Sequence, residues 1–102
     1  MRIIVTGGLG FLGSNLIRLI INKDHFKKII VVDNLSKSNL TYLKSITKFK
    51  YHASANKYKE TNDRVSVIKA DIKNYSFAKT ITKGIDAVVH LAAESGIDVS
   101  IR

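Results

Sequence analysis

Four short runs of mostly apolar residues divide the chain, at residues 2–6, 28–33, 64–70 and 85–91. The second run contains four consecutive β-branched residues. Unbroken runs of this kind, in place of strict alternation between polar and apolar positions, are typical of strands in a parallel sheet that is covered on both faces. The pattern therefore predicts four buried strands.

A helical period separates the first two runs. Leu12, Leu16, Leu19 and Ile20 recur at the spacing of one helix face. We expect a helix here whose apolar stripe, made of these four residues, packs against the sheet. The polar residues 22–24 are expected to end it.

The other connections are less regular. Residues 40–48 are compatible with a short helix, and residues 74–82 predict another that stops at Gly84. Residues 49–63 show no clean period and are predicted to be an irregular surface excursion. Residues 95–102 are predicted to begin a further helix.

Alternation of strands and helices predicts an α/β fold, a Rossmann-type doubly wound parallel sheet with right-handed crossovers. The first four strands then take the order 3-2-1-4. In that order the fourth strand, residues 85–91, is an apolar edge, and such edges invite pairing with other chains. We therefore expect residues 1–102 to be the N-terminal, incomplete portion of such a domain, or else to cover this edge by association.

Glycines mark the junction between the first strand and the first helix. Gly7, Gly10 and Gly13 are spaced three apart, and a G-x-G-x-x-G count that starts at Gly8 also fits. Glycine permits a sharp turn, lets a diphosphate reach the backbone amides and lets the helix pack closely on its strand. The helix N-terminus adds roughly half a positive charge. The junction therefore predicts a cradle for the diphosphate of a dinucleotide.

An acidic residue closes the second strand at the distance that such a cradle requires. Asp33 stands 20 residues beyond Gly13. A carboxylate there can accept hydrogen bonds from both hydroxyls of an adenosine ribose, and it repels the additional phosphate of NADP. We therefore expect NAD as the cofactor.

Composition limits the remaining classes of function. With 102 residues and no cysteine, the chain has room for one small domain and cannot form a disulfide framework or a thiolate metal site. No two of its three histidines lie at ligand spacing on one element, so no metal site is expected. The sequence shows no secretory leader and no apolar run of the ~20 residues that span a bilayer. We expect a soluble, cytoplasmic protein without a membrane partner.

The formal net charge of +9 is unevenly distributed, with six lysines and no acid in residues 37–59. Clustered lysines beside Tyr42, Tyr51 and Tyr58 allow a nucleic-acid interface, because lysines release counterions from phosphates and tyrosines stack on bases. The tyrosines follow no RNA-binding signature. We favour a solvated, lysine-rich surface and expect no nucleic-acid partner.

The motifs resemble, in order and placement, those of the extended short-chain dehydrogenase/reductase family, the NAD-dependent epimerases and dehydratases of nucleotide sugars. The resemblance covers nearly all of the chain except residues 49–63. It is carried by four stretches: Thr6-Gly7-Gly8-Leu9-Gly10-Phe11-Leu12-Gly13, Asp33-Asn34-Leu35, Asp71-Ile72 and His90-Leu91-Ala92-Ala93-Glu94-Ser95.

This resemblance implies a set of cofactor-binding residues that runs from the diphosphate to the nicotinamide. Around the diphosphate and the ribose these are Gly7, Gly10, Phe11, Leu12, Asp33, Asn34, Leu35, Ser36 and Ser38. Beside the adenine and toward the nicotinamide they are Asp71, Ile72, Leu91, Ala92, Ala93 and Ser95. For three of these residues a structural role is the alternative: Asp71 could only cap a turn, and Phe11 and Leu12 could contribute packing. His90 receives no chemical role.

Two subfamilies are represented. Residues 94–101 look most like the dTDP-glucose 4,6-dehydratases, although Gly96 and Val99 depart from the histidine and arginine usual there. Residues 33–38 look more like the UDP-galactose 4-epimerases. The resemblance therefore leaves the subfamily open.

The resemblance implies catalysis by transient hydride transfer, assisted by a tyrosine and by a lysine four residues after it. The chain contains one such pair, Tyr75 and Lys79, on the predicted crossover helix after the third strand. That helix lies on the adenine side, so we expect a chance match and assign no catalytic residue.

The sequence therefore predicts the NAD-binding part of a nucleotide-sugar epimerase or dehydratase, a lyase or an isomerase. The catalytic pair and the substrate domain are expected to be absent from this chain, and the complete enzyme is expected to bind a nucleotide sugar and to form a homo-oligomer, a dimer. Two alternatives remain: a stand-alone dinucleotide-binding or regulatory module, and a basic nucleic-acid-binding protein.

Overall fold

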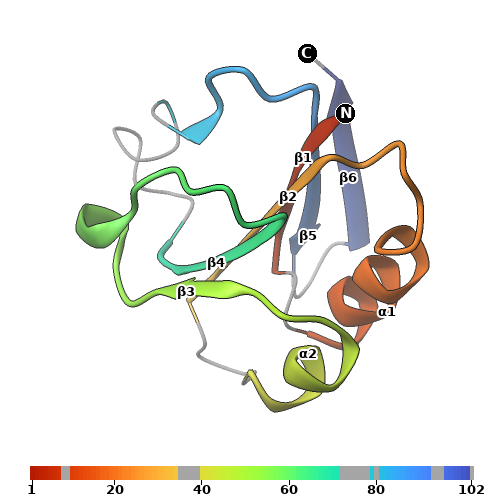
Figure 1. The fold of residues 1–102 in the computed structure, drawn as a ribbon. Helices are drawn as coiled ribbons and strands as arrows, with labels where there is room; N and C mark the ends of the chain where they lie inside the picture. Colours follow the sequence, from red (N-terminus) through yellow and green to blue (C-terminus); the bar gives the residue numbers. More distant parts are fainter. Residues whose placement is uncertain (8–9, 35–39, 72–78, 80, 93–95, 102) are drawn as a thin grey trace.

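One six-stranded sheet organises the chain (Figure 1). The computed structural model describes all residues except 8–9, 35–39, 72–78, 80, 93–95 and 102. The strands are β1 (Arg2–Thr6), β2 (Lys28–Asp33), β3 (Lys50–His52), β4 (Val65–Lys69), β5 (Ala87–Ala92) and β6 (Gly96–Ile101). The helices are α1 (Phe11–Ile20), α2 (Thr41–Ile46) and the short 3-10 helix η1 (Ala55–Lys57).

The strand order is β3-β4-β2-β1-β5-β6. The four predicted strands correspond to β1, β2, β4 and β5, and they stand in the predicted relative order and run parallel. The α/β doubly wound prediction is confirmed. The sheet as a whole differs from it by one additional strand at each edge.

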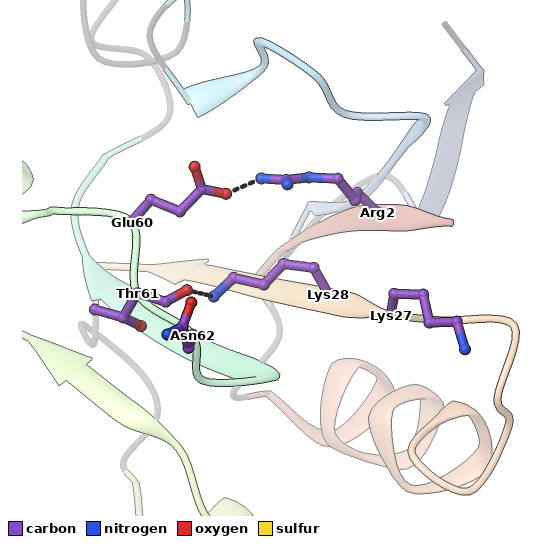
Figure 2. A pocket seen from close by; sticks show the side chains of 6 residues that line it. All are labelled: Arg2, Lys27, Lys28, Glu60, Thr61 and Asn62. Carbon is purple, nitrogen blue, oxygen red and sulfur yellow. Dashed lines mark hydrogen bonds and ion pairs between the residues drawn. The ribbon is translucent and has the colours of Figure 1, made fainter.

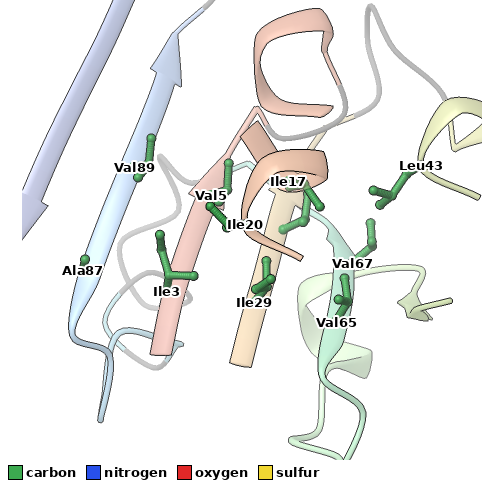
Figure 3. Packing of buried hydrophobic residues seen from close by; sticks show 11 residues of the cluster. Ile3, Val5, Ile17, Ile20, Ile29, Leu43, Val65, Val67, Ala87 and Val89 are labelled. Atoms are coloured by element: carbon green, nitrogen blue, oxygen red, sulfur yellow. The ribbon is translucent and has the colours of Figure 1, made fainter. Parts of the chain in front are cut away.

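Two apolar layers hold the sheet. On one face, α1 and α2 cover a cluster formed by Ile3, Val5, Ile17, Ile20, Ile29, Val31, Leu43, Val65, Val67, Ala87 and Val89 (Figure 3). On the other face lies a smaller cluster of Ile4, Ile30, Val32, Ile68, Ile81 and Ile85. Successive residues of one strand therefore enter opposite layers, which explains why the runs are apolar at nearly every position.

Helix α1 presents a different face to the sheet from the one that the leucine spacing predicts. Leu12 and Leu19 are 56% and 64% exposed, whereas Gly13, Ile17 and Ile20 are buried. The predicted stripe is wrong at these two leucines. The buried face of the helix carries Gly13, Ile17 and Ile20, at positions i, i+4 and i+7. The leucine spacing misses this face because glycine adds no apolar side chain to the pattern.

The prediction for the last residues is also wrong. Residues 96–101 form a strand, β6, which pairs antiparallel with β5 from Ala87↔Ile101 to Ala92↔Gly96. The segment alternates β-branched and polar residues, a pattern that favours a strand where an open edge offers partners. Strand β5 is therefore not an edge strand.

Residues 49–63, predicted as an irregular excursion, contain β3 and η1. Strand β3 pairs in parallel with β4 over three positions, of which the last is His52↔Ile68. Lys50 and Tyr51 are exposed and only His52 is buried, so this edge strand carries no apolar period that a sequence pattern could reveal. The predicted helix at 40–48 is confirmed as α2. The one at 74–82 lies mostly outside the described residues.

His52 is the buried polar residue of β3. Its ring packs edge-on against Tyr58, with ring centroids 5.0 Å apart, and its Nε2 atom has no hydrogen-bond partner among the described residues. Burial lowers the pKa of His52, and the positive charges of Lys50 and Lys28 act in the same direction. The folded chain therefore favours the neutral imidazole.

This burial makes stability depend on pH. The unfolded chain keeps an imidazole of ordinary pKa, 6.5, and so binds more protons than the folded chain below that pH. We expect the stability contributed by neutral His52 to be complete above pH 6.5 and to be lost as the pH falls below it. Thermal melts of His52→Phe should show a smaller loss of Tm on acidification than the wild type, whereas His25→Phe, which removes an exposed imidazole, should keep the wild-type profile. Identical profiles for all three proteins would contradict this prediction.

Candidate cofactor site at the carboxyl edge of the sheet

Four residues from four strands line up where the parallel strands end. Val5, Val31, Val67 and Val89 all enter the layer beneath α1 and α2, and each strand alternates its side chains between the two faces. In β2, β4 and β5 the residues two positions further along therefore share this face, and Gly7, which directly follows β1, lies between them, with its amide bonded to the Val32 carbonyl. The four residues are, across the sheet, Leu91, Gly7, Asp33 and Lys69, and we call them the carboxyl-edge row.

Gly7 lies at the centre of this row and is confined on both sides. Its amide donates to the Val32 carbonyl at 2.8 Å, and a Cβ atom at this position would overlap the backbone carbonyl of Leu91. Its φ angle of +71° is in the left-handed region, which glycine adopts without strain. Only glycine fits this turn, which follows β1 and is enclosed by the backbones of β2 and β5.

The turn leads directly into α1. The Gly10 amide donates to the Gly7 carbonyl at 3.2 Å, and the Gly10 carbonyl accepts from the Ser14 amide at 2.9 Å. Gly10 is the N-cap, and no described side chain caps the helix or places an acid in its first turn. The first amides of a helix have no partner within it and carry its positive end. This helix start therefore suits an anion.

Gly10 differs from Gly7 in what it requires. Its φ angle is −74°, and a Cβ atom there would meet only the Gly7 carbonyl, at 3.5 Å, an ordinary contact. Nothing in the described chain therefore demands glycine at position 10. A diphosphate that lies against the backbone requires a residue without a side chain, so the glycine at position 10 fits such a ligand.

Asp33 ends β2 beside the turn. Its side chain is half-buried, and its carbonyl accepts from the Ala70 amide at 3.1 Å, which holds the end of β4 against β2. Asn34 and Asp71 follow the two strands and are exposed. The structure therefore brings the predicted ribose-side and adenine-side carboxylates to one edge.

Thr6 and His90 add a contact that the sequence analysis did not identify. They are register partners in β1 and β5, and Thr6 Oγ1 hydrogen-bonds with His90 Nδ1. Thr6 is 3% exposed, so the bond ties the two strands together immediately before Gly7 and Leu91. His90 thus has a structural role. The sequence signal for this contact was Thr6, the polar residue that ends the first apolar run.

Nine of the predicted site residues lie in the part of the chain that the structure describes: Gly7, Gly10, Phe11, Leu12, Asp33, Asn34, Asp71, Leu91 and Ala92. All belong to the carboxyl ends of strands, the residues directly after them, or the start of α1. Leu35, Ser36, Ser38, Ile72, Ala93 and Ser95 lie outside the described residues, as does Tyr75 of the rejected tyrosine and lysine pair.

A cleft of about 530 Å³ lies at the opposite, amino edge of the sheet (Figure 2). Lys28 Nζ donates there to the carbonyls of Thr61, at 3.0 Å, and Asp63, and Arg2 forms an ion pair with Glu60. Burial lowers the pKa of Lys28, while Glu60 and Asp63 oppose that effect. These cations anchor the segment before β4, so we assign the cleft a structural role.

In the part of the chain that the structure describes, no three histidines or carboxylates are grouped so that they could hold a metal ion. None of the described helices is long and apolar enough to cross a membrane.

A protein-family model described as GDP-mannose 4,6 dehydratase matches residues 4–102. Over 103 residues the chain is 42% identical to the dTDP-glucose 4,6-dehydratase of Haemophilus influenzae, a match that covers 99% of this chain and 27% of the relative. It is 31% identical to the UDP-glucose 4-epimerase of Halalkalibacterium halodurans, covering 100% of this chain and 25% of that one.

A solved structure shows the same arrangement. The dTDP-glucose 4,6-dehydratase of Bacillus anthracis, crystallised in complex with NAD, aligns with 92% of this chain and 27% of its own, with a TM-score of 0.70 and 30% identity. The chain therefore spans about a quarter of the length of the proteins that it matches.

Proposed function

Because the chain belongs to the family described as GDP-mannose 4,6 dehydratase, we propose that it is the N-terminal, NAD-binding part of a nucleotide-sugar dehydratase or epimerase. Residues 1–102 form the first portion of the Rossmann domain, and the substrate-binding region belongs to further sequence. The complete protein acts on a nucleotide sugar by transient hydride transfer.

One observation carries the proposal: the turn at Gly7, the uncapped start of α1 and the half-buried Asp33 adjoin one another at the carboxyl edge of a parallel sheet. Ligands of open α/β sheets bind at this edge, where the strand order reverses. Here the reversal lies between β1 and β5, because β2, β3 and β4 all lie on one side of β1 and β5 lies on the other. The start of α1 stands at that point.

Each residue then has a defined task. The first amides of α1 donate to the diphosphate, and Gly10 leaves room for it. The Asp33 carboxylate accepts from the two ribose hydroxyls and disfavours the 2′-phosphate of NADP, so NAD is the proposed cofactor. Asp71 flanks the adenine, while Leu91 and Ala92 extend the path toward the nicotinamide. When bound, NAD supplies the hydride acceptor. We assign no catalytic residue in this chain.

The dehydratase and epimerase readings both draw support from relatives at 42% and 31% identity. The features described here serve the cofactor, which both reactions use, so the reaction outcome is not part of the proposal. We also propose a cytoplasmic location and a homodimeric assembly for the complete protein.

The proposal is tested by NAD binding to the chain and to Asp33→Ala, measured by isothermal titration calorimetry. We expect affinity to fall at least about tenfold, because two hydrogen bonds to a charged acceptor are lost. Asp33→Asn, which keeps the side-chain shape, should fall between the two. Asp33 is half-buried at a strand end, so thermal melts should show that both variants fold.

Two results would overturn the proposal. If the folded wild-type chain bound no NAD at millimolar concentration, the cofactor assignment would be wrong. If it bound single-stranded nucleic acid in a salt-sensitive manner that Asp33→Ala left unchanged, the lysine-rich surface would be its functional surface instead. Tight NAD binding by the chain alone would favour the stand-alone module.

A further inference from the structure

A basic residue lies beside Asp33 in the carboxyl-edge row. Asp33 and Lys69 are register partners in the parallel pair of β2 and β4, and neighbouring strands of a sheet are roughly 4.8 Å apart. Val31 and Val67, two residues earlier, share one apolar layer, so the side chains of Asp33 and Lys69 leave the sheet on the same face. Lys69 is exposed.

From this placement we propose that Lys69 is a cofactor-specificity residue, one that determines how strongly the chain distinguishes NAD from NADP. This inference rests on the proposed function. A ribose held by Asp33 would lie beside the end of β2, next to the end of β4 that carries Lys69. The ammonium of Lys69 there offsets the repulsion between the Asp33 carboxylate and a 2′-phosphate.

The charges of the pair act differently on the two cofactors. NAD presents hydroxyls, which need an acceptor, so its affinity depends on Asp33 and little on a neighbouring cation. NADP presents a phosphate of about two negative charges, which the carboxylate repels and a lysine attracts as a point charge. Lys69 therefore contributes mainly to NADP binding and makes the preference for NAD weaker than Asp33 alone would make it.

The other described cations near the strand ends do not offer the same contact. Lys28 and Arg2 stand at the amino edge, where they bind the segment before β4. Lys83 lies before β5, also toward the amino edge. Lys37 is outside the described residues and is therefore included in the experiment as a competitor for the role.

The test is calorimetric titration with NAD and with NADP at low ionic strength. The proteins titrated are the wild type, Lys69→Gln, Asp33→Asn and the double variant. Lys69→Gln should lower NADP affinity about three- to tenfold and change NAD affinity less than about twofold. Asp33→Asn should raise NADP affinity, and the double variant should lose that gain. The matched control is Lys83→Gln, which removes the same charge at the other edge and should leave both affinities unchanged.

Several results would overturn the assignment. Lys69→Gln could weaken both cofactors equally, which would indicate a general charge effect. Lys83→Gln could lower NADP affinity as much as Lys69→Gln does, which would also indicate a general charge effect. Lys37→Gln could remove the NADP affinity of Asp33→Asn while Lys69→Gln did not, which would transfer the role to Lys37. If neither cofactor bound the folded wild type, the proposed function itself would fail. If NAD bound but Lys69→Gln left NADP affinity unchanged, only the role of Lys69 would fail.

Discussion

Gly7→Ala should destabilise the chain more than the same change at Gly10 or at Gly84. The new Cβ would overlap the Leu91 carbonyl, and an alanine would also have to adopt a φ angle of +71°. The unfavourable φ costs about 1 kcal/mol and the overlap about 2 kcal/mol or more. For a domain of this size we expect Tm to fall by roughly 12 °C or more, measured by circular dichroism.

Gly84 supplies a matched control. Its φ angle is +72°, almost the same as at Gly7, but a Cβ atom there would meet nothing within 4 Å. Gly84→Ala should therefore lose only the conformational part, about 1 kcal/mol. Equal losses of Tm in the two variants would show that the Leu91 carbonyl does not confine the turn.

Gly10→Ala should leave stability nearly unchanged and abolish most NAD binding. The φ angle of −74° suits alanine, and the nearest atom to the added Cβ is at 3.5 Å. In the proposed complex the same Cβ occupies the space that the diphosphate needs at the start of α1. We expect affinity to fall roughly a hundredfold, through the loss of charge-assisted hydrogen bonds from the helix amides.

Two measurements on Gly10→Ala test this expectation. Circular dichroism melts should place Gly10→Ala within a few degrees of the wild type, and calorimetric titration should show the loss of NAD affinity. Gly84→Ala, far from the carboxyl-edge row, should bind NAD as the wild type does. A stable Gly10→Ala with undiminished affinity would mean that the diphosphate does not lie on this turn.

The strands of the central sheet could be predicted because burial on both faces imposes apolar residues at consecutive positions. For β1 and β2 the predicted and observed bounds coincide. The glycine spacing and Asp33 likewise predicted which segments meet at one edge, since parallel strands all end there. Fold and edge therefore follow from local pattern together with one rule of sheet topology.

The rotation of α1 could not be predicted from its leucines. Leu12 and Leu19 have the spacing of a buried face, yet both are exposed, whereas Gly13, which carries no hydrophobic signal, is buried with Ile17 and Ile20. The Gly10 amide donates to the Gly7 carbonyl directly before α1, so a backbone contact precedes the helix. A pattern of apolar side chains contains no information about a contact made by backbone.

Pairing between distant residues was the other missing information. The hydrogen bond between Thr6 and His90 and the juxtaposition of Asp33 and Lys69 both depend on register, which a single sequence does not specify. The strand at residues 50–52 was missed for a related reason, since an edge strand exposes most of its side chains and needs only a neighbour's free backbone groups.

The confinement of Gly7 also bears on the order in which the chain acquires its shape. The glycine turn follows β1 and precedes β2, β4 and β5 in the chain. The wall on the other side of the turn is the backbone of Leu91 in β5. During synthesis from the N-terminus, the turn therefore stays open on one side until the fifth strand emerges. If the turn holds the diphosphate as proposed, its two walls are complete only when β5 is present, although Gly7 and Gly10 lie near the start of the sheet.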